Sequence, residues 1–272
     1  MKKFFYITFV ALYFICTQPA FAGWPMGKKR FMLGAGVSAF FAKDYWDADG
    51  KYIRGTKTFA SYSLGINGSY GLSRRLDLVF SVPIAIQVNN YATSDRVSAG
   101  LADLTLGLSY NLINYKYKNY TSVYGGVIVP LYAKFADQTL GLGMYGTEVK
   151  LMNTGNLALE DKKAYYNLEV GYRQFYDPNG PSQITYLAAL GYSIDKENQL
   201  VLDVSGIYSS SPDKQRIIFT GAARDYRVTR TSLSYAHAFS RRFSLSASGF
   251  YTLTARNTGR GYGFGLQGLY RF

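Results

Sequence analysis

The last twelve residues of the chain, 261–272, alternate strictly between two kinds of side chain. One set is aromatic or aliphatic apart from one glycine, and the other set is small or polar apart from Leu269. The first set is Tyr262, Phe264, Leu266, Gly268, Tyr270 and Phe272. A period of two predicts a β-strand whose two faces meet different surroundings. Because chain ends usually fray into polar residues, an aromatic last residue indicates that this strand stays in a sheet to its end.

The same alternation recurs in segments of about ten residues. We expect strands at 31–41, 58–70, 76–88, 104–112, 121–131, 143–151, 165–175, 184–194, 200–208, 228–239, 243–253 and 261–272. One face of each is apolar, and the other is rich in serine, glycine and asparagine, which is too polar for a protein core. A membrane barrel has hydrocarbon outside and water or packed polar groups inside. The sequence therefore predicts an all-β fold, a transmembrane antiparallel β-barrel of about twelve strands.

Short and long connections between these segments are expected to alternate along the chain. Short basic turns are predicted at 71–75 and 240–242, and longer connections at 43–56, 89–98, 133–141, 153–162, 209–227 and 254–260. An even number of strands places both termini on the periplasmic side, as in bacterial single-chain barrels. Pro83 and Pro130 fall inside expected strands, and a proline without an N–H predicts a bulge or bend there.

The N-terminus has the form of a Sec signal peptide. Lys2 and Lys3 precede an apolar run, and Ala20-Phe21-Ala22 has the small-x-small pattern of a cleavage site. We therefore expect residues 1–22 to be removed and residues 23–272 to form one barrel domain without a cysteine. No run reaches the roughly twenty apolar residues of a transmembrane helix. The expected location is the outer membrane of a diderm bacterium.

The composition agrees with a barrel and narrows the partners. Aromatic residues make up 17% of the chain, yet the mean hydropathy is only −0.08, as expected when alternating faces cancel. The formal net charge is +13, but the cations are not clustered in the sequence. Export argues against a nucleic-acid partner. Lipopolysaccharide phosphates, outer-membrane lipid headgroups or anions in a lumen are the expected partners of these cations.

Several short motifs carry a resemblance to known outer-membrane proteins. They are Gly23-Trp24-Pro25, Asp47-Ala48-Asp49-Gly50, Ser69-Tyr70-Gly71-Leu72, Val82-Pro83-Ile84 and Gly100-Leu101-Ala102-Asp103-Leu104. Together they resemble the barrel family named after the MetA pathway of phenol degradation, and the likeness covers most of residues 23–272. The resemblance implies a transporter linked to hydrophobic or aromatic compounds.

The closing segment resembles the C-terminal signal of bacterial outer-membrane barrels, which ends on an aromatic residue with another two positions earlier. Here these are Phe272 and Tyr270. The resemblance implies that Phe264, Leu266, Tyr270 and Phe272 are recognised by the barrel-assembly machinery and that this strand then closes the barrel against the first one.

Enzymatic chemistry has little support in the sequence. A lipid hydrolase needs serine, histidine and an orienting group together on the lipid-facing surface. The single histidine, His237, is expected to face lipid near the periplasmic rim with no serine in phase, as a residue of the aromatic girdle. Asp44, Asp47 and Asp49 do not have the spacing of an EF-hand loop, so no metal site and no cofactor is predicted.

Charged residues at inward positions are the candidates for the lumen. They are Asp77, Asp103, Glu148, Lys150, Glu169, Arg173, Asp203 and Arg230, with Arg271 near the end of the last strand. Because an unpaired charge in a narrow lumen is costly, comparable numbers of both signs predict salt bridges across the barrel, nearly one for one. We expect a narrow channel constricted by Asp103, Glu169, Arg173 and Arg230.

Three aromatic residues in the first long loop, Tyr45, Trp46 and Tyr52, predict either an apolar entrance for hydrophobic solutes or part of the membrane girdle. The sequence thus favours a monomeric channel or transporter for a small, hydrophobic or aromatic solute. A non-conducting barrel with a structural or adhesion role is the alternative, and an outer-membrane hydrolase is less favoured.

Overall fold

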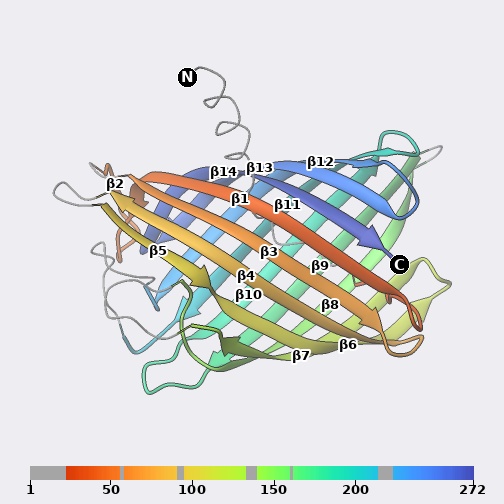
Figure 1. The fold of residues 1–272 in the computed structure, drawn as a ribbon, viewed down its shortest axis with the longest axis horizontal. Coiled ribbons are helices and arrows are strands. Elements are labelled where there is room, and N and C mark those ends of the chain that lie inside the picture. The colour runs from red at the N-terminus through yellow and green to blue at the C-terminus, as the bar shows by residue number, and fades with distance from the viewer. Residues whose placement is uncertain (1–22, 56–57, 91–94, 133–139, 160–161, 214–222) are drawn as a thin grey trace, which may run out of the picture.

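The computed structural model describes residues 23–55, 58–90, 95–132, 140–159, 162–213 and 223–272. The expected signal peptide, 1–22, lies outside the described residues, so it stays a prediction. All regular structure in the described chain is β-strand (Figure 1). Among these residues there is no helix with the length and apolar character that crossing a membrane requires.

The strands form one continuous antiparallel sheet. Their bounds are β1 Phe31–Trp46, β2 Tyr52–Ile53, β3 Phe59–Gly71, β4 Leu76–Asn90, β5 Asp95–Leu101, β6 Asp103–Tyr115, β7 Asn119–Pro130, β8 Gly146–Leu159, β9 Lys162–Phe175, β10 Ser182–Ser193, β11 Asn198–Ser210, β12 Tyr226–Ala238, β13 Phe243–Arg256 and β14 Thr258–Arg271. Apart from β2, which pairs with β1, and β5, which pairs with β4, the strands pair in chain order, and β14 returns to β1. The two-residue β2 only extends the end of β1, and β5 and β6 are two parts of one wall strand. The result is a closed barrel of twelve strands, as the sequence predicts.

The seam between β14 and β1 closes the barrel. The strands pair from Met32 with Arg271 up to Trp46 with Thr258, with one register shift between Ala42 and Asp44. At the end of the seam the Phe272 N–H donates to the Phe31 carbonyl at 2.8 Å. The two phenylalanine rings lie 5.5 Å apart between centroids. No free edge is left at the termini, which is the closure expected from the aromatic last residue.

Two prolines coincide with an irregularity in the wall. Strand β4 pairs with β6 up to Ser81 and with β5 from Ile84, and between them Ala102 donates its N–H to the Pro83 carbonyl at 2.8 Å. Pro130 is the last residue of β7 and pairs with Asp103. Among the described residues, β5 pairs only with β4. The predicted bend therefore lies opposite Pro83 and at Pro130, where the proline nitrogens cannot continue the hydrogen-bond ladder.

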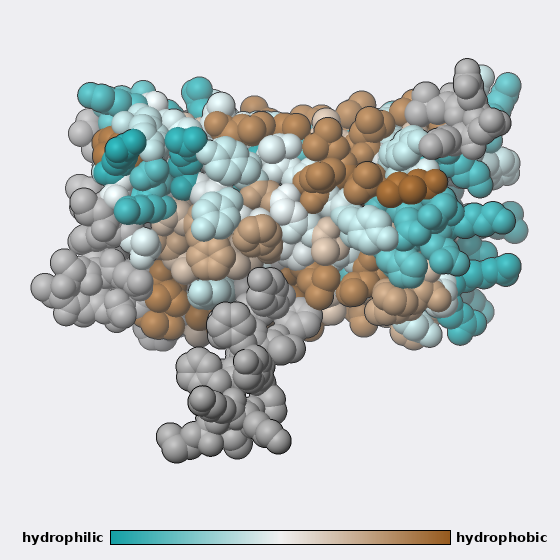
Figure 2. All heavy atoms as spheres, turned by 90° about the horizontal axis from the view of Figure 1, so that it is seen from above, coloured by the Kyte–Doolittle hydropathy of each residue, from teal (hydrophilic) through white to brown (hydrophobic). Residues whose placement is uncertain are grey.

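The outer surface of the barrel is apolar between two hydrophilic ends (Figure 2). Leu106, Leu108 and Tyr110 of β6 are 40–44% exposed, whereas the intervening Gly107 is buried. The same alternation holds on the other strands, where aliphatic and aromatic side chains face outward. So large an exposed apolar surface is stable only against hydrocarbon.

Some expected connections are in fact paired strand. Residues 153–162 belong mostly to β8 and β9, 254–260 to β13 and β14, and 89–98 includes the ends of β4 and β5. Most residues of these strand ends are polar, so the apolar alternation weakens before the backbone pairing stops. Between β13 and β14 only Asn257 separates the strands, with a positive φ of 53°, a conformation that asparagine tolerates.

The two ends of the barrel differ in their connections. At one end, here called the short-turn end, tight turns join β3 to β4, β6 to β7, β10 to β11 and β12 to β13, and both the start of β1 and the C-terminus lie there (Figure 1). In the turn after β10, three hydrogen bonds, led by one from the Asn198 side chain, hold the pKa of the Asp195 carboxyl below its usual range. The opposite end, the long-loop end, includes the connections between β7 and β8 and between β11 and β12.

We expect the seam to be sensitive to volume at Gly263. A Cβ there would overlap the Ala39 carbonyl oxygen of β1 and the Phe250 ring, and the backbone oxygen cannot move without separating the strands. Gly263→Ala should lower the free energy of unfolding by about 1–3 kcal/mol, the usual cost of overpacking. Urea titration, followed by the heat-modifiable shift on gels, measures this.

The matched control is Gly125→Ala on β7, where an added Cβ meets nothing within 4 Å. Its unfolding midpoint should equal that of the wild type. Equal midpoints for the two variants would contradict the seam geometry.

Candidate functional site in the barrel lumen

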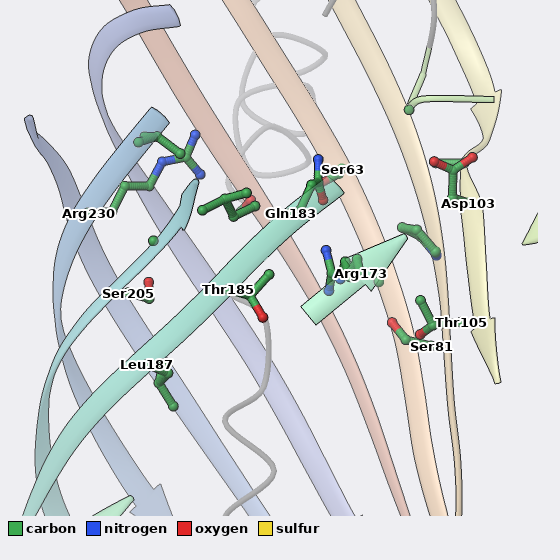
Figure 3. Close-up of a pocket in the computed structure, with 18 of the residues that line it drawn as sticks. Ser63, Ser81, Asp103, Thr105, Arg173, Gln183, Thr185, Leu187, Ser205 and Arg230 are labelled. Atoms are coloured by element: carbon green, nitrogen blue, oxygen red, sulfur yellow. The ribbon is translucent and has the colours of Figure 1, made fainter. Parts of the chain in front are cut away.

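The barrel encloses a cavity of about 960 Å³ that is lined by residues of all twelve wall strands. The eight charged residues expected at inward positions all line it: Asp77, Asp103, Glu148, Lys150, Glu169, Arg173, Asp203 and Arg230. In the close-up, Arg230 lies on one side of the cavity and Asp103 on the other, with Arg173 between them (Figure 3). That these residues constrict a conduction path stays a prediction.

Apolar side chains also line the cavity, which the sequence did not reveal. They include Phe40, Phe59 and Phe250 together with Val79, Ile128, Leu187 and Val228. Phe40 contacts both other phenylalanines, with ring centroids 6.3 Å apart in each pair, and its ring is nearly parallel to that of Phe250. Phe40, Val79 and Ile128 have apolar neighbours on both sides in the sequence, so the two faces of those strands are hard to tell apart from hydropathy alone.

The ion pairs of the lumen run along the wall and not across it. Glu148 of β8 stands opposite Arg173 of β9 in register, and its carboxylate is 2.5 Å from the Arg173 Nε. The same carboxylate oxygen is 3.4 Å from the Nζ of Lys150, two residues along β8. Among the described lumen residues no salt bridge crosses the barrel, so the expectation of cross-barrel pairs is not met there. Side chains on paired strands are about 5 Å apart, so they meet each other before they reach the far wall.

The other lumen carboxylates are held by neutral donors. Asp77 accepts the Met26 N–H at 2.9 Å, and Asp103 accepts the Leu142 N–H at 3.0 Å. Glu169 accepts the Asn167 amide at 2.8 Å, and Asp203 accepts the Ser232 hydroxyl. One-for-one pairing of opposite charges, as expected from the sequence, was therefore wrong as well, because backbone and side-chain donors take the place of cations.

A segment before β1 folds back into the lumen at the short-turn end. The Gly23 carbonyl accepts the Ser122 hydroxyl at 3.0 Å, and the Trp24 ring lies edge-on to Tyr165 with centroids 5.4 Å apart. With the Met26 bond to Asp77 on β4, the segment 23–26 contacts β4, β7 and β9 on different sides of the barrel. The sequence analysis missed this role. The only signal was that Trp24 and Met26 are apolar in a segment that is otherwise small or basic.

At the long-loop end, residues after β7 narrow the cavity. Leu140 and Leu142 line it, and Met144 packs with Ile128 and Phe175 in a buried hydrophobic cluster. Residues 140–144 are thus folded against the inside of the wall.

The structure divides the three loop aromatics between the two expected roles. Tyr45 lines the cavity near this mouth. Trp46 and Tyr52 instead contact each other and the guanidinium of Arg260, at 5.8 and 5.2 Å from their ring centroids. One residue therefore faces the lumen and two form an aromatic cluster at the rim.

Exposed cations gather at the short-turn end, although the sequence suggested no cluster. They are Lys28, Lys29, Arg30, Arg74, Arg75, Lys116, Lys118, Lys163, Lys196, Arg241, Arg242 and Arg271. In the described part of that end, the acids are Asp195 and Glu197. Arg271, expected inside the lumen, is exposed here. The charges come together because separate turns meet at one rim.

The structure shows no arrangement typical of catalysis around His237. Its Nδ1 is 2.8 Å from the Asn198 side-chain oxygen, and its ring packs edge-on against Phe239 at 4.6 Å. These contacts place it in an aromatic rim at the short-turn end. Within the described ranges, no group of three or more histidine, cysteine or acidic side chains is placed to hold a metal ion.

Comparison with solved structures supports the same architecture. The COG4313 outer membrane channel from Pseudomonas putida F1 superposes with a TM-score of 0.72 at 15% identity, covering 94% of this chain and 100% of that one. The transport unit of the autotransporter AIDA-I from Escherichia coli gives a TM-score of 0.51 at 8% identity, over 97% and 96% of the two chains. At these identities the likeness concerns the fold. A search of curated proteins finds no match.

A family model described as "Putative MetA-pathway of phenol degradation" matches residues 86–267, about two thirds of the chain. This agrees with the resemblance found in the short motifs and with the closed barrel. The protein is an outer-membrane β-barrel, and its chain belongs to that family.

Proposed function

We propose that the protein is a channel for a small hydrophobic or aromatic solute, which enters an apolar and charged lumen closed at one end by the N-terminal segment. The observation that carries this proposal is the cavity of about 960 Å³ with phenylalanine, valine and leucine among its lining residues. Water-filled porins have polar interiors. A cavity of this size that contains aromatic rings is suited to bind a small organic molecule.

The proposal includes an orientation and a set of partners. The termini and the short-turn end face the periplasm after removal of residues 1–22, and the long-loop end faces outward. The protein acts as a monomer, and the closed wall leaves no terminal strand edge through which a second copy could pair. The barrel-assembly machinery recognises Phe264, Leu266, Tyr270 and Phe272. The rim cluster of Arg260, Trp46 and Tyr52 contacts lipopolysaccharide.

The chemistry proposed for the lumen is binding and passage without catalysis. The only histidine is held by Asn198 and Phe239 at the rim, away from the cavity lining. The lumen carboxylates are occupied by donors from the chain itself. These contacts favour a passive conduit over a hydrolase.

A non-conducting barrel is the second candidate, because the segment 23–26 spans the lumen at the short-turn end. The two candidates differ in whether this segment can leave. As a plug it would be held by a few contacts, whereas as a permanent part of the barrel it would keep the lumen closed in every state.

Removing the contacts of the segment should open the channel. Asp77→Ala deletes the acceptor of the Met26 N–H, and Trp24→Ala deletes the ring against Tyr165. In planar bilayers we expect small currents from the wild type and a several-fold larger single-channel conductance from the double variant.

Asp195→Ala is the control, since it removes an acid from the same end but outside the lumen. Its conductance should equal that of the wild type. Silence of the double variant at all voltages and salt concentrations would remove the channel proposal and leave the structural barrel.

The two tryptophans allow the solute to be detected inside the lumen. Trp24 lines the cavity and Trp46 lies at the rim, so Trp46→Phe leaves a single reporter in the lumen. In lipid nanodiscs, toluene should change the Trp24 emission saturably, while glucose should leave it unchanged. Trp24→Phe, which keeps only the rim tryptophan, should show no saturable change. A linear response of both variants would indicate partition into lipid and contradict solute entry.

A further inference from the structure

Arg230 is a lumen cation without a carboxylate partner. Its Nε is inaccessible and has no hydrogen-bond partner, and it forms no ion pair with the described residues. Among the titratable groups of the described chain, the Tyr226 phenol acts on its charge. Of the other cations that line the cavity, Arg173 and Lys150 pair with Glu148, and Lys43 is exposed. Arg230 therefore stands apart from the ion pairs of the wall.

Aromatic rings surround this guanidinium. Its central carbon lies 5.0 Å from the centroid of Phe40 and 5.9 Å from that of Phe250. Cation–π contacts of this kind are weaker than a charged hydrogen bond and leave the guanidinium N–H groups unused. The hydrogen-bonding capacity of an arginine packed among rings in a narrow lumen is therefore only partly used. A group that uses the remaining N–H donors must be a hydrogen-bond acceptor.

The neighbours of Arg230 offer no negative charge. Tyr226 is hydrogen-bonded to the Gln183 side chain, which donates to the Ser209 hydroxyl at 3.2 Å. The charges of Arg230 and Arg173 both act on the Tyr226 phenol. In the close-up the Arg230 guanidinium points into the cavity toward Gln183, and Asp103 lies on the far wall (Figure 3). This side of the lumen therefore attracts an anion.

We propose that Arg230, Phe40 and Phe250 form a binding site in the lumen for an amphipathic monocarboxylate, whose carboxylate pairs with Arg230 and whose apolar body packs on the rings. The site rests on the proposed function in that a solute enters the lumen, and it names the chemical class of that solute. Arginine presents two parallel N–H groups that match a carboxylate, which makes the pair directional as well as charged.

The apolar part of the ligand is required by the same geometry. Phe59 extends the Phe40–Phe250 pair along the lining, with its ring edge-on to Phe40. A small inorganic anion would leave these rings in contact with water, whereas an aryl or alkyl chain would cover them. The site should therefore prefer benzoate to acetate, and benzoate to its neutral analogue benzyl alcohol.

Equilibrium dialysis tests the site directly. Radiolabelled benzoate is dialysed against the full protein in lipid nanodiscs, with empty nanodiscs subtracted. We expect one saturable site per chain, with acetate and benzyl alcohol each competing at least roughly tenfold more weakly, as expected on loss of the apolar body or of a charged hydrogen bond. Arg230→Gln should weaken benzoate binding by roughly tenfold or more, and Arg230→Lys, which keeps the charge without the fork, by less.

Arg74→Gln serves as the matched control, because it removes an exposed arginine from a turn outside the lumen. Its benzoate affinity should equal that of the wild type. The ligand comparison in the wild type needs no variant, so a failure of Arg230→Gln to fold would not prevent the test. Equal competition by benzyl alcohol, or unchanged affinity in folded Arg230→Gln, would overturn the site and leave Arg230 a packing residue.

The dialysis measures binding and not passage, so its outcome is separate from the conductance of the channel. Benzoate binding in a protein that never conducts would keep the site and refute the channel. Conductance without benzoate binding would keep the channel and refute the binding site.

Discussion

The absence of water in the bilayer interior is the constraint on which this structure depends. A backbone N–H or C=O left unpaired in hydrocarbon costs several kcal/mol, so the sheet has to close on itself. Here closure is made by β14 and β1, paired along almost their whole length and ending with the Phe272 N–H on the Phe31 carbonyl. Glycines at 261 and 263 let the two strands approach, because a Cβ at either would meet a carbonyl oxygen of β1.

Closure with twelve strands also sets what the lumen can contain. An interior of this width is too narrow for free water to screen charges fully, so each charged side chain needs a partner nearby. Glu148 has two cations, and Asp77, Asp103, Glu169 and Asp203 have neutral donors. Two of those donors are backbone groups of the N-terminal segment and of the loop after β7. The carboxylates thus position the chain segments that shape the two ends of the cavity.

The fold was predictable because one physical rule acts on every wall residue. Outward side chains meet hydrocarbon, so the alternation along 104–112 or 261–272 places strands, phase and closure without any long-range information. That rule no longer applies where the strands leave the membrane, and there the predicted strand ends were wrong. Residues 153–162, for example, were expected to form a connection but mostly continue the pairing of β8 and β9.

The inward position of the eight charged residues followed from the same phase, but their partners did not. Partners depend on which strands are neighbours in register, as for Glu148 and Arg173, and on segments that return from outside the sheet, as for Asp77 and Met26. The isolation of Arg230 could not be predicted either, since it results from every lumen carboxylate being used elsewhere. The similar numbers of acidic and basic residues suggested pairing, whereas in the structure Arg230 has no carboxylate partner.

The distribution of donors and charges along the barrel axis is consistent with an anionic solute in spite of the surplus of acids in the lumen. An acid repels an anion strongly when its charge is free, and much less when N–H or O–H dipoles are directed at it. The five carboxylates predicted to face the lumen all accept such bonds or ion pairs, while Arg230 keeps its own charge uncompensated. Beyond the N-terminal segment, the rim of the short-turn end is densely cationic. A carboxylate that moved from Arg230 toward that end would therefore pass partnered acids and arrive at a surface of opposite charge.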